Sequence, residues 1–352
     1  MAEDIVAGST KLWMDYLSFH PTYRELRDLK KREWSDKGGD TFFENRRKNA
    51  SKPNQKGKAS FYEMTKQVDK GMALETNIFK LDSVCPRMLD LCMAPGGFTT
   101  TAAKDTPGSL IDAVTLPTES GGYEVMAKNI CQNIIYADIT MYLLEMACQE
   151  IIPTAHPDSG SFELCQPFLD NRYDIAICGG AVGRDHPRES YRSDCESQRL
   201  MVSQLVFAMH RLKPGGSLVL LLHRIESWDT VCILHAFNEF SDIQLYKHPK
   251  AHAIKSSFYL VAKRVNLEHH AARESMEYWK SLWKYLTFKN FEEIPLVRSN
   301  LYGSDETFVQ YIRDSFGPQF LRLAEPIWEV QAEALRNAPF MRHAPRFHVR
   351  NY

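Results

Sequence analysis

The chain has 352 residues, which is enough for one large domain with additions or for two domains. Apolar residues make up 44% and charged residues 25%, an ordinary balance for a folded protein that argues against wholesale disorder. The 43 basic and 44 acidic residues give a formal charge of -1, so a generally basic nucleic-acid-binding protein is not indicated, although a local basic patch is compatible with this balance.

The sequence also indicates where the protein works. The longest apolar run lies near residues 218–222 and is far too short to cross a bilayer, and the acidic start of the chain does not resemble a secretory signal. Eight cysteines occur without a C-x-x-C pair, and several lie in apolar runs. This pattern predicts free thiols in a reducing compartment and no metal site. We therefore expect a cytoplasmic or nuclear protein that does not enter a membrane.

Residues 1–70 are polar with a helical pattern, and Trp13, Leu17 and Tyr23 are the side chains expected to anchor this N-terminal arm to a core. Residues 45–58 contain six basic residues, no acid and several loop-forming residues. We interpret this stretch as a solvated connecting loop with local positive charge. The alternative interpretation is a contact with nucleic acid.

From residue 71 to residue 265, short apolar runs alternate with amphipathic stretches. The runs predicted to be strands are residues 88–92, 109–114, 133–136, 173–178, 217–222, 243–246 and 258–262. Stretches with helical spacing separate them, such as residues 200–212, which end at a Pro/Gly stop. This alternation predicts an α/β protein with a mostly parallel sheet covered by helices on both faces. The short connection between the last two strands favours an antiparallel pair.

Two further regions lack strand patterns. Residues 150–172 are rich in Pro, Asp, Ser and Gly, and if they lie on the ligand side of the sheet they form a candidate lid. Residues 266–352 are predicted to be a helical C-terminal extension, in which Trp279 and Trp283 belong to an apolar stripe at helix spacing. We interpret this stripe as core packing against the sheet domain rather than as a platform that stacks bases.

The strongest functional signal is LDLCMAPGGFTT at residues 89–100, where a buried strand ends in a Gly-rich turn and a helix begins near Phe98. Ligands of open α/β sheets bind at this end of the first strand, close to backbone N–H groups. Gly96 and Gly97 are expected to remove side chains where a ligand approaches the backbone. The spacing is neither G-x-G-x-x-G nor G-x-x-x-x-G-K-[ST], so a dinucleotide site and a P-loop are poorly supported.

The pattern D-x-C-x-A-P-G-G-F resembles the first motif of the FtsJ-like methyltransferases, which bind S-adenosylmethionine. The positions that coincide with the motif are Asp90, Cys92, Ala94, Pro95, Gly96, Gly97 and Phe98. Residues 136–140 resemble the family segment whose aspartate contacts the adenine, which nominates Asp138. Three later stretches resemble family segments in the same order: residues 173–181, 212–219 and 256–262. The residues at 223–224 and 255–259 are most similar to a divergent fungal branch of the family.

This resemblance implies a Rossmann-like methyltransferase fold with a seven-stranded sheet whose last strand is antiparallel, and S-adenosyl-L-methionine as the cofactor. The RNA-modifying members of the family use a Lys-Asp-Lys-Glu tetrad that holds and activates a ribose 2′-hydroxyl. In this sequence the four positions fall on Tyr62 or Glu63 (with Lys66 or Lys70 as nearby substitutes), Gly179, Leu221, and Ser257 or Phe258. The tetrad is therefore degraded.

The acid that often holds the cofactor ribose is also missing from its usual place, because Val114 aligns there. Asp112 lies two residues earlier, so it shares that face of the strand but sits deeper in it.

Losing the tetrad argues more against ribose methylation than against methyl transfer in general, because placing the acceptor in line supplies much of the rate. A hydroxyl acceptor still needs a base. The candidate bases are His223 and His186, with Asp185 as a group that orients one of them, and Arg224 and Lys255 are cations suited to an anionic acceptor. The alternatives are a structural role for His223, a surface turn at residues 184–188 and a solvated Lys255.

Three functions are compatible with these observations. The first is an active methyltransferase whose acceptor is not an RNA ribose, such as a small molecule, and it follows from the intact turn and the degraded tetrad. The second is a catalytically inactive, cofactor-binding relative that acts through a partner protein, and it follows from Gly179 and Leu221. The third is an RNA 2′-O-methyltransferase with rearranged catalytic groups, supported by the family and by the basic residues 46–58. We favour the first function.

Overall fold

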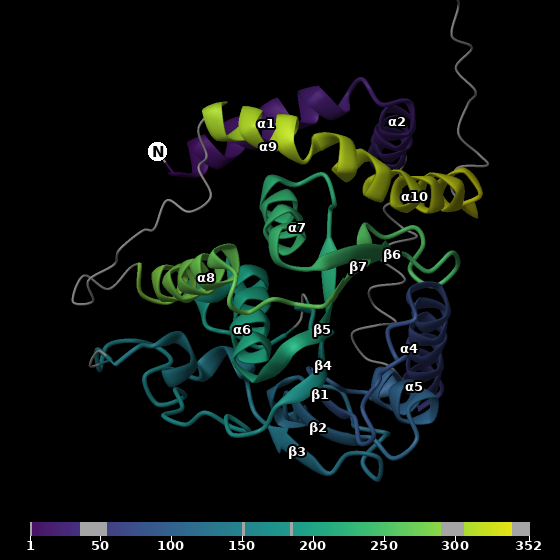
Figure 1. Cartoon of the computed structure of the whole chain (residues 1–352). Coiled ribbons are helices and arrows are strands. Elements are labelled where there is room, and N and C mark those ends of the chain that lie inside the picture. The colour runs from purple at the N-terminus through teal and green to yellow at the C-terminus, as the bar shows by residue number, and fades with distance from the viewer. Residues whose placement is uncertain (1, 36–54, 150–151, 184–185, 290–305, 340–352) are drawn as a thin grey trace, which may run out of the picture.

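The computed structural model describes residues 2–35, 55–149, 152–183, 186–289 and 306–339. Its centre is a seven-stranded sheet in the order β3-β2-β1-β4-β5-β7-β6 (Figure 1). The strands are β1 (Arg87–Leu91), β2 (Leu110–Thr115), β3 (Asn133–Tyr136), β4 (Tyr173–Cys178), β5 (Leu212–His223), β6 (Asp242–Tyr246) and β7 (Ser257–Lys263). Neighbouring strands from β3 to β5 are parallel, whereas β7 is antiparallel to both β5 and β6. The predicted fold class is confirmed.

One strand begins earlier than predicted. Helix α6 (Glu196–Arg211) ends at its predicted Pro/Gly stop, but β5 starts at once with Leu212 instead of near residue 217. The stop residues form an irregular start to the strand, because Gly215 has a φ of 77°. The backbone N–H of Gly215 donates to Val265 O at 2.9 Å, so these residues still pair with a neighbouring segment.

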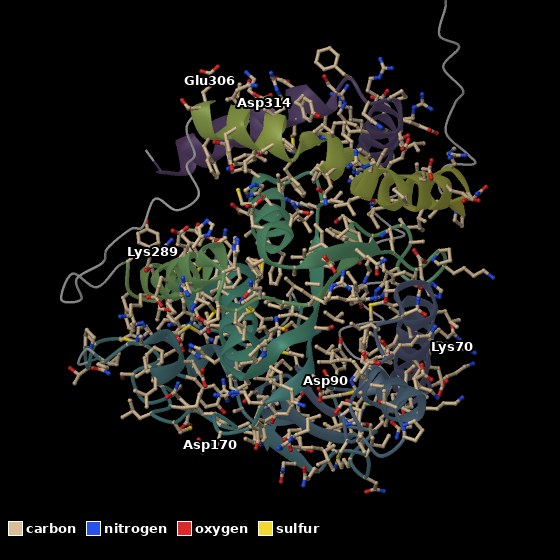
Figure 2. The ribbon with its side chains drawn as sticks, viewed as in Figure 1. Lys70, Asp90, Asp170, Lys289, Glu306 and Asp314 are labelled. Atoms are coloured by element: carbon tan, nitrogen blue, oxygen red, sulfur yellow. The ribbon has the colours of Figure 1, made fainter. Side chains whose placement is uncertain are left out.

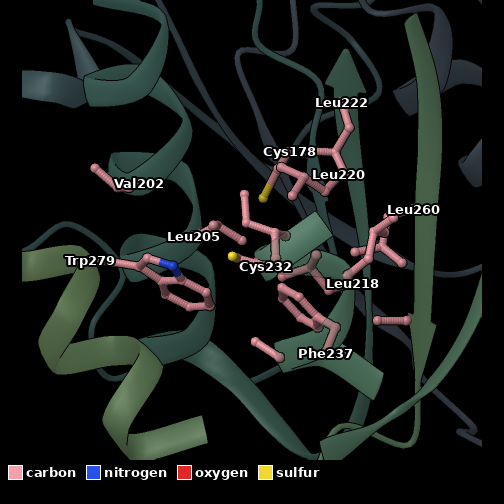
Figure 3. Close-up of a cluster of buried hydrophobic side chains, with 14 of the residues drawn as sticks. Cys178, Val202, Leu205, Leu218, Leu220, Leu222, Cys232, Phe237, Leu260 and Trp279 are labelled. Carbon is pink, nitrogen blue, oxygen red and sulfur yellow. The ribbon is translucent and has the colours of Figure 1, made fainter. Parts of the chain in front are cut away.

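Helices cover both faces of the sheet (Figure 1). Helices α6, α7 (Trp228–Phe240) and α8 (His270–Phe288) lie on one face, and α4 (Gln55–Thr76) and α5 (Gly97–Asp105) on the other. Side chains of β5 alternate between these layers, as the period of two requires. Leu218, Leu220 and Leu222 join the core beneath α6–α8 (Figure 3), whereas Val219 joins the core beneath α4 and α5.

The terminal helices α1 (Ala2–Leu17), α2 (Pro21–Ser35), α9 (Glu306–Ser315) and α10 (Gly317–Arg336) pack together beyond α7 and the β6–β7 side of the sheet (Figure 1). Trp13, Leu17 and Tyr23 are buried, which confirms their predicted anchoring role. The Trp13 ring lies 5.8 Å from that of Trp228 at the start of α7. Trp279 is also buried, so its predicted role in core packing is confirmed.

The candidate lid is fixed to the body of the protein over residues 152–172, the part that the structure describes. His156 is buried, and its Nε2 lies 3.2 Å from the carbonyl oxygen of Thr287 in α8. Asp158 is also buried and accepts a 2.6 Å hydrogen bond from the Tyr191 hydroxyl. These contacts make the segment a packed connection between β3 and β4.

All eight cysteines are free, as predicted. Within the described ranges, no helix has both the length and the apolar character that a membrane span requires. The same ranges contain no cluster of three or more His, Cys, Asp or Glu side chains suited to a metal ion. The basic stretch at residues 45–58 lies mostly outside the described residues, but its end, residues 55–58, is the first turn of α4 and not a loop.

Candidate functional site

The Gly-rich turn after β1 lies at the carboxyl edge of the parallel sheet. The backbone N–H groups of Cys92 and Met93 donate to Val114 O at 2.8 and 3.2 Å, which extends the pairing of β1 with β2. The chain then turns through Gly96, with a φ of 101°, into α5. Because β1 lies between β2 and β4, this is the point where the strand order reverses, the usual ligand site of such sheets.

Asp90 supports this turn from inside the protein (Figure 2). Its carboxylate accepts hydrogen bonds from the Thr99 hydroxyl, at 2.5 Å, and from the Thr99 backbone, so it satisfies an otherwise unpaired N–H in the first turn of α5. Burial raises the pKa of Asp90 to about 7, although the bonds from Thr99 oppose this shift. The predicted motif residue Asp90 therefore holds the turn in shape.

The space left by the two glycines is occupied by the protein itself. A Cβ on Gly97 would lie 2.0 Å from Thr65 Oγ1 and 2.8 Å from the backbone nitrogen of Lys66, both in α4. A Cβ on Gly96 would lie 2.6 Å from the Ala127 Cβ. Part of the reason for glycine at these positions is therefore packing, because α4 and the loop after β2 fill the space of both side chains.

The remaining motif residues tie the turn to its neighbours. Phe98 is buried, and its ring lies 5.5 Å from that of Tyr259 in the core beneath α4 and α5. The Ala94 N–H donates to Thr115 Oγ1 at 3.3 Å, and Pro95 O accepts from Met126 N at 2.9 Å. Burial raises the pKa of the Cys92 thiol, so Cys92 is protonated at neutral pH and is not a nucleophile.

Asp138 stands at the same edge, two residues after β3. Its Oδ1 accepts from the backbone and the hydroxyl of Thr140 at 2.9 and 2.8 Å, and its Oδ2 lies 3.3 Å from Nη1 of Arg192. The Asp138 side chain keeps 30% of its surface exposed, whereas Arg192 is buried and also paired with Asp158. These contacts fix the Asp138 carboxylate in one orientation and leave part of it accessible.

Asp112 is not available to a ligand at this edge. It is completely buried, and its carboxylate accepts from the Tyr173 hydroxyl and from Asn133 Nδ2, both at 2.8 Å. The nearest exposed acid after β2 is Glu119, in the short helix η1 (Thr118–Ser120). Glu119 was not among the residues singled out from the sequence, although it is an acid five residues beyond the predicted strand end.

The positions that the family resemblance aligns with the tetrad lie apart from one another in their local contacts. Gly179 follows β4, and a Cβ built there would meet nothing closer than Leu91 O at 4.0 Å. Leu221 on β5 pairs with Tyr259 on β7. The Tyr62 hydroxyl lies 2.7 Å from Thr100 Oγ1. The Gly179 position thus has room for a carboxylate that this chain lacks.

We expect the variant Gly179→Asp to fold normally, with a change in the free energy of unfolding below about 1 kcal/mol, because the site is open. It should gain no RNA ribose methylation, because the other tetrad positions, such as Leu221, remain without catalytic groups. Thermal unfolding and transfer of a labelled methyl group to RNA check the two parts. Ribose methylation by this variant would contradict the second part.

The other catalytic candidates fall into two groups. His223 ends β5 opposite Ser257 of β7, and the N–H of Arg224 donates to Ser256 O at 3.0 Å, so these residues and Lys255 are brought together. His186 lies on the β2 side instead, with its Cδ2 3.7 Å from the position of a Cβ on Gly121. Asp185 lies outside the described residues.

Two pKa shifts mark the β5–β7 group. Desolvation lowers the pKa of His223, and the nearby cations Lys255, Lys247 and Arg224 lower it further. Lys247 is buried, and its Nζ donates to the carbonyl oxygens of Lys255 and Ser257 at 2.6 and 2.7 Å. Burial lowers the pKa of Lys247 to about 7. The burial of Lys247 was not predicted, because a lysine after an edge strand is normally solvated.

A mostly parallel seven-stranded sheet with one antiparallel strand, and a Gly-rich turn at its point of reversal, define a Rossmann-like methyltransferase fold. The FtsJ-like methyltransferase family model matches residues 67–265, more than half of the chain. The protein belongs to this family. No curated protein matches the sequence.

The solved structures that this chain matches are distant in sequence. A ribosomal RNA methyltransferase, putative, from Plasmodium falciparum is 16% identical over 57% of this chain and 96% of its own, with a TM-score of 0.36. Human methyltransferase-like protein 13 in complex with SAH is 15% identical over 68% and 96%, with a TM-score of 0.35. An rRNA methylase from Streptococcus thermophilus is 12% identical over 59% and 95%, with a TM-score of 0.31.

Proposed function

We propose that this protein binds S-adenosylmethionine at the turn after β1 and transfers its methyl group to a small acceptor other than an RNA ribose. The observation that carries the proposal is a contrast along one edge of the sheet. The cofactor half keeps the family turn and the oriented Asp138, whereas the acceptor half has an empty space at Gly179 and an apolar Leu221.

The residues present fit this cofactor. The accessible part of Asp138 suits the amino group of an adenine, and the exposed Glu119 suits ribose hydroxyls in place of the buried Asp112. The backbone of the turn and the start of α5 suit the carboxylate of the methionine part. When bound, the cofactor supplies a methyl group already activated on a sulfonium centre.

On the acceptor side, His223 is the residue best suited to take up a proton. Its lowered pKa keeps the imidazole neutral at pH 7, the state that a general base requires. Arg224 and Lys255 lie on the same side and suit an anionic acceptor. His186 and Asp185 remain predicted alternatives from the other side of the turn. Because protonated His223 is inactive in this role, turnover should fall as the pH drops through its pKa.

The test is calorimetric titration of the protein with S-adenosylmethionine. We expect the variant Asp138→Asn to bind about 10- to 100-fold more weakly, because a hydrogen bond to a charged group contributes roughly 1.5–3 kcal/mol. The matched control is Asp170→Asn, an exposed aspartate away from the turn (Figure 2), which should bind normally. Equal thermal stability of the two variants excludes misfolding as the cause.

Labelled methyl transfer then separates the three functions. Transfer to small acceptors, with loss in His223→Gln but retained cofactor binding, is the expected result. Binding without transfer to any acceptor class would support the inactive relative, and transfer to RNA ribose would support the rearranged RNA enzyme. Absence of binding at millimolar cofactor would overturn the proposal as a whole.

A further inference from the structure

Four basic side chains gather where β5, β6 and β7 meet the carboxyl edge of the sheet, and we call this group the cationic rim: His223, Arg224, Lys247 and Lys255. The rim is built by the backbone pairing of its segments. His223 pairs with Ser257, and the N–H of Arg224 donates to Ser256 O at 3.0 Å. The Lys247 ammonium donates to Lys255 O at 2.6 Å and so brings the end of β6 against the β6–β7 turn.

Several positive charges lie around His223. The groups that act on His223 are Lys255, Lys247 and Arg224, all of them positive. Lys30 of α2 adds a further positive charge that acts on Lys247, and it is paired with Glu226 at 3.0 Å. His252 contributes its carbonyl oxygen to Lys247 at 3.5 Å. Gathering like charges opposes folding, so the arrangement is more favourable when an anion is bound.

The terminal helices cover the side of this rim. The Lys30–Glu226 pair joins α2 to the turn between β5 and α7. Gln331 of α10 donates to Ile254 O at 2.9 Å and so joins α10 to the β6–β7 turn. Both turns that carry the rim are therefore held by the terminal helices, which favours a compact ligand over a long polymer lying across this edge.

We propose that the cationic rim is a subsite for an oxyanion, a carboxylate or phosphate group, carried by a compact methyl acceptor. Arg224 and Lys255 present exposed side chains that can bind the anion directly. Lys247 is buried among carbonyl oxygens, and its bonds to Lys255 O and Ser257 O hold the β6–β7 turn against the end of β6. This inference rests on the proposed function for its acceptor, but anion binding can be measured without any methyl transfer.

The test is an NMR titration of the His223 imidazole in the full-length protein, assigned with His223→Gln and recorded with sodium sulfate or with sodium chloride at equal ionic strength. We expect sulfate to raise the titration midpoint of His223 in a saturable way, because a bound anion offsets the three cations. Acetate and a phosphate monoester then distinguish a carboxylate from a phosphate. A midpoint that responds equally to sulfate and chloride would overturn the subsite.

Charge variants make the test specific. Arg224→Gln and Lys255→Gln should each raise the midpoint in chloride by on the order of half a pH unit, because one repelling charge is removed, and should weaken the sulfate effect. The matched control is Lys104→Gln, an exposed lysine at the end of α5, which should change neither. If a short oligoribonucleotide shifts the His223 midpoint at a much lower concentration than sulfate does, the proposal of a compact acceptor is contradicted.

Calorimetry with S-adenosylmethionine on the same variants separates the two proposals. Normal cofactor binding without a sulfate effect would refute the anion subsite and would not affect the proposed function. A sulfate effect without cofactor binding would refute the proposed function and would show that the cationic rim binds anions independently of it.

Discussion

Replacing Asp69 by asparagine is expected to stabilise the protein, and to do so more strongly as the pH rises. Asp69 lies on α4 and is completely buried, and within the described part of the chain neither carboxylate oxygen has a hydrogen-bond partner. Burial raises its pKa well above the ordinary value of 3.8, and the nearby Asp90 and Asp105 raise it further. The folded protein therefore favours a neutral carboxyl group at this position.

The direction of the pH effect follows from proton binding. Above pH 3.8 the unfolded chain loses the Asp69 proton, whereas the folded protein retains it until the pH reaches the raised pKa. The folded state then binds more protons, so its stability falls with rising pH, by about 1.4 kcal/mol per pH unit across this window. Asp90, with a pKa raised to about 7, acts in the same direction between pH 3.8 and about 7.

Asparagine removes the titration at position 69 while keeping the size of the side chain. The variant should therefore resemble the parent protein near pH 4 and exceed its stability by a margin that grows as the pH rises toward 8. Chemical denaturation at a series of pH values measures this difference. Asp28→Asn, on the exposed face of α2, should follow the parent curve. Parallel curves for Asp69→Asn and the parent protein would show that Asp69 is ionised in the fold.

The fold was largely predictable because burial on two sheet faces leaves a clear pattern in the sequence. The central strands contain short apolar runs, and stripes such as Trp279 and Trp283 indicate the helices that cover them. The start of β5 was missed because a Pro/Gly stop normally indicates a loop. In this chain Gly215 continues the pairing with a left-handed residue and a hydrogen bond to Val265.

The candidate site was predictable only where one short segment builds it. The turn from Asp90 to Phe98 is contiguous, so its residues identify it directly. The cationic rim is different, because it joins residues that are distant in sequence through backbone pairing of β5, β6 and β7. No local pattern reveals that Lys247 is buried beneath the β6–β7 turn, since this depends on the tertiary packing of its surroundings.

The variant Gly97→Ala is expected to lose about 1–3 kcal/mol of stability, because the added methyl group overlaps α4. Its Cβ would stand 2.0 Å from Thr65 Oγ1 and 2.8 Å from the Lys66 backbone nitrogen, and a backbone atom cannot move without shifting the helix. Helix propensity alone predicts the opposite sign, since alanine stabilises a helix by up to about 1 kcal/mol relative to glycine. Chemical denaturation therefore separates packing from propensity.

The control for this variant is Gly160→Ala, where an added Cβ meets nothing within 4 Å and the stability should change by less than about 0.5 kcal/mol. Adding Thr65→Ala to Gly97→Ala removes the hydroxyl oxygen and should recover part of the loss. A stable Gly97→Ala protein that fails to bind S-adenosylmethionine would assign this glycine to the ligand. If the Gly97→Ala variant is unstable but binds S-adenosylmethionine normally once it is stabilised, for example by Asp69→Asn, then the role of Gly97 is to let α4 pack on α5.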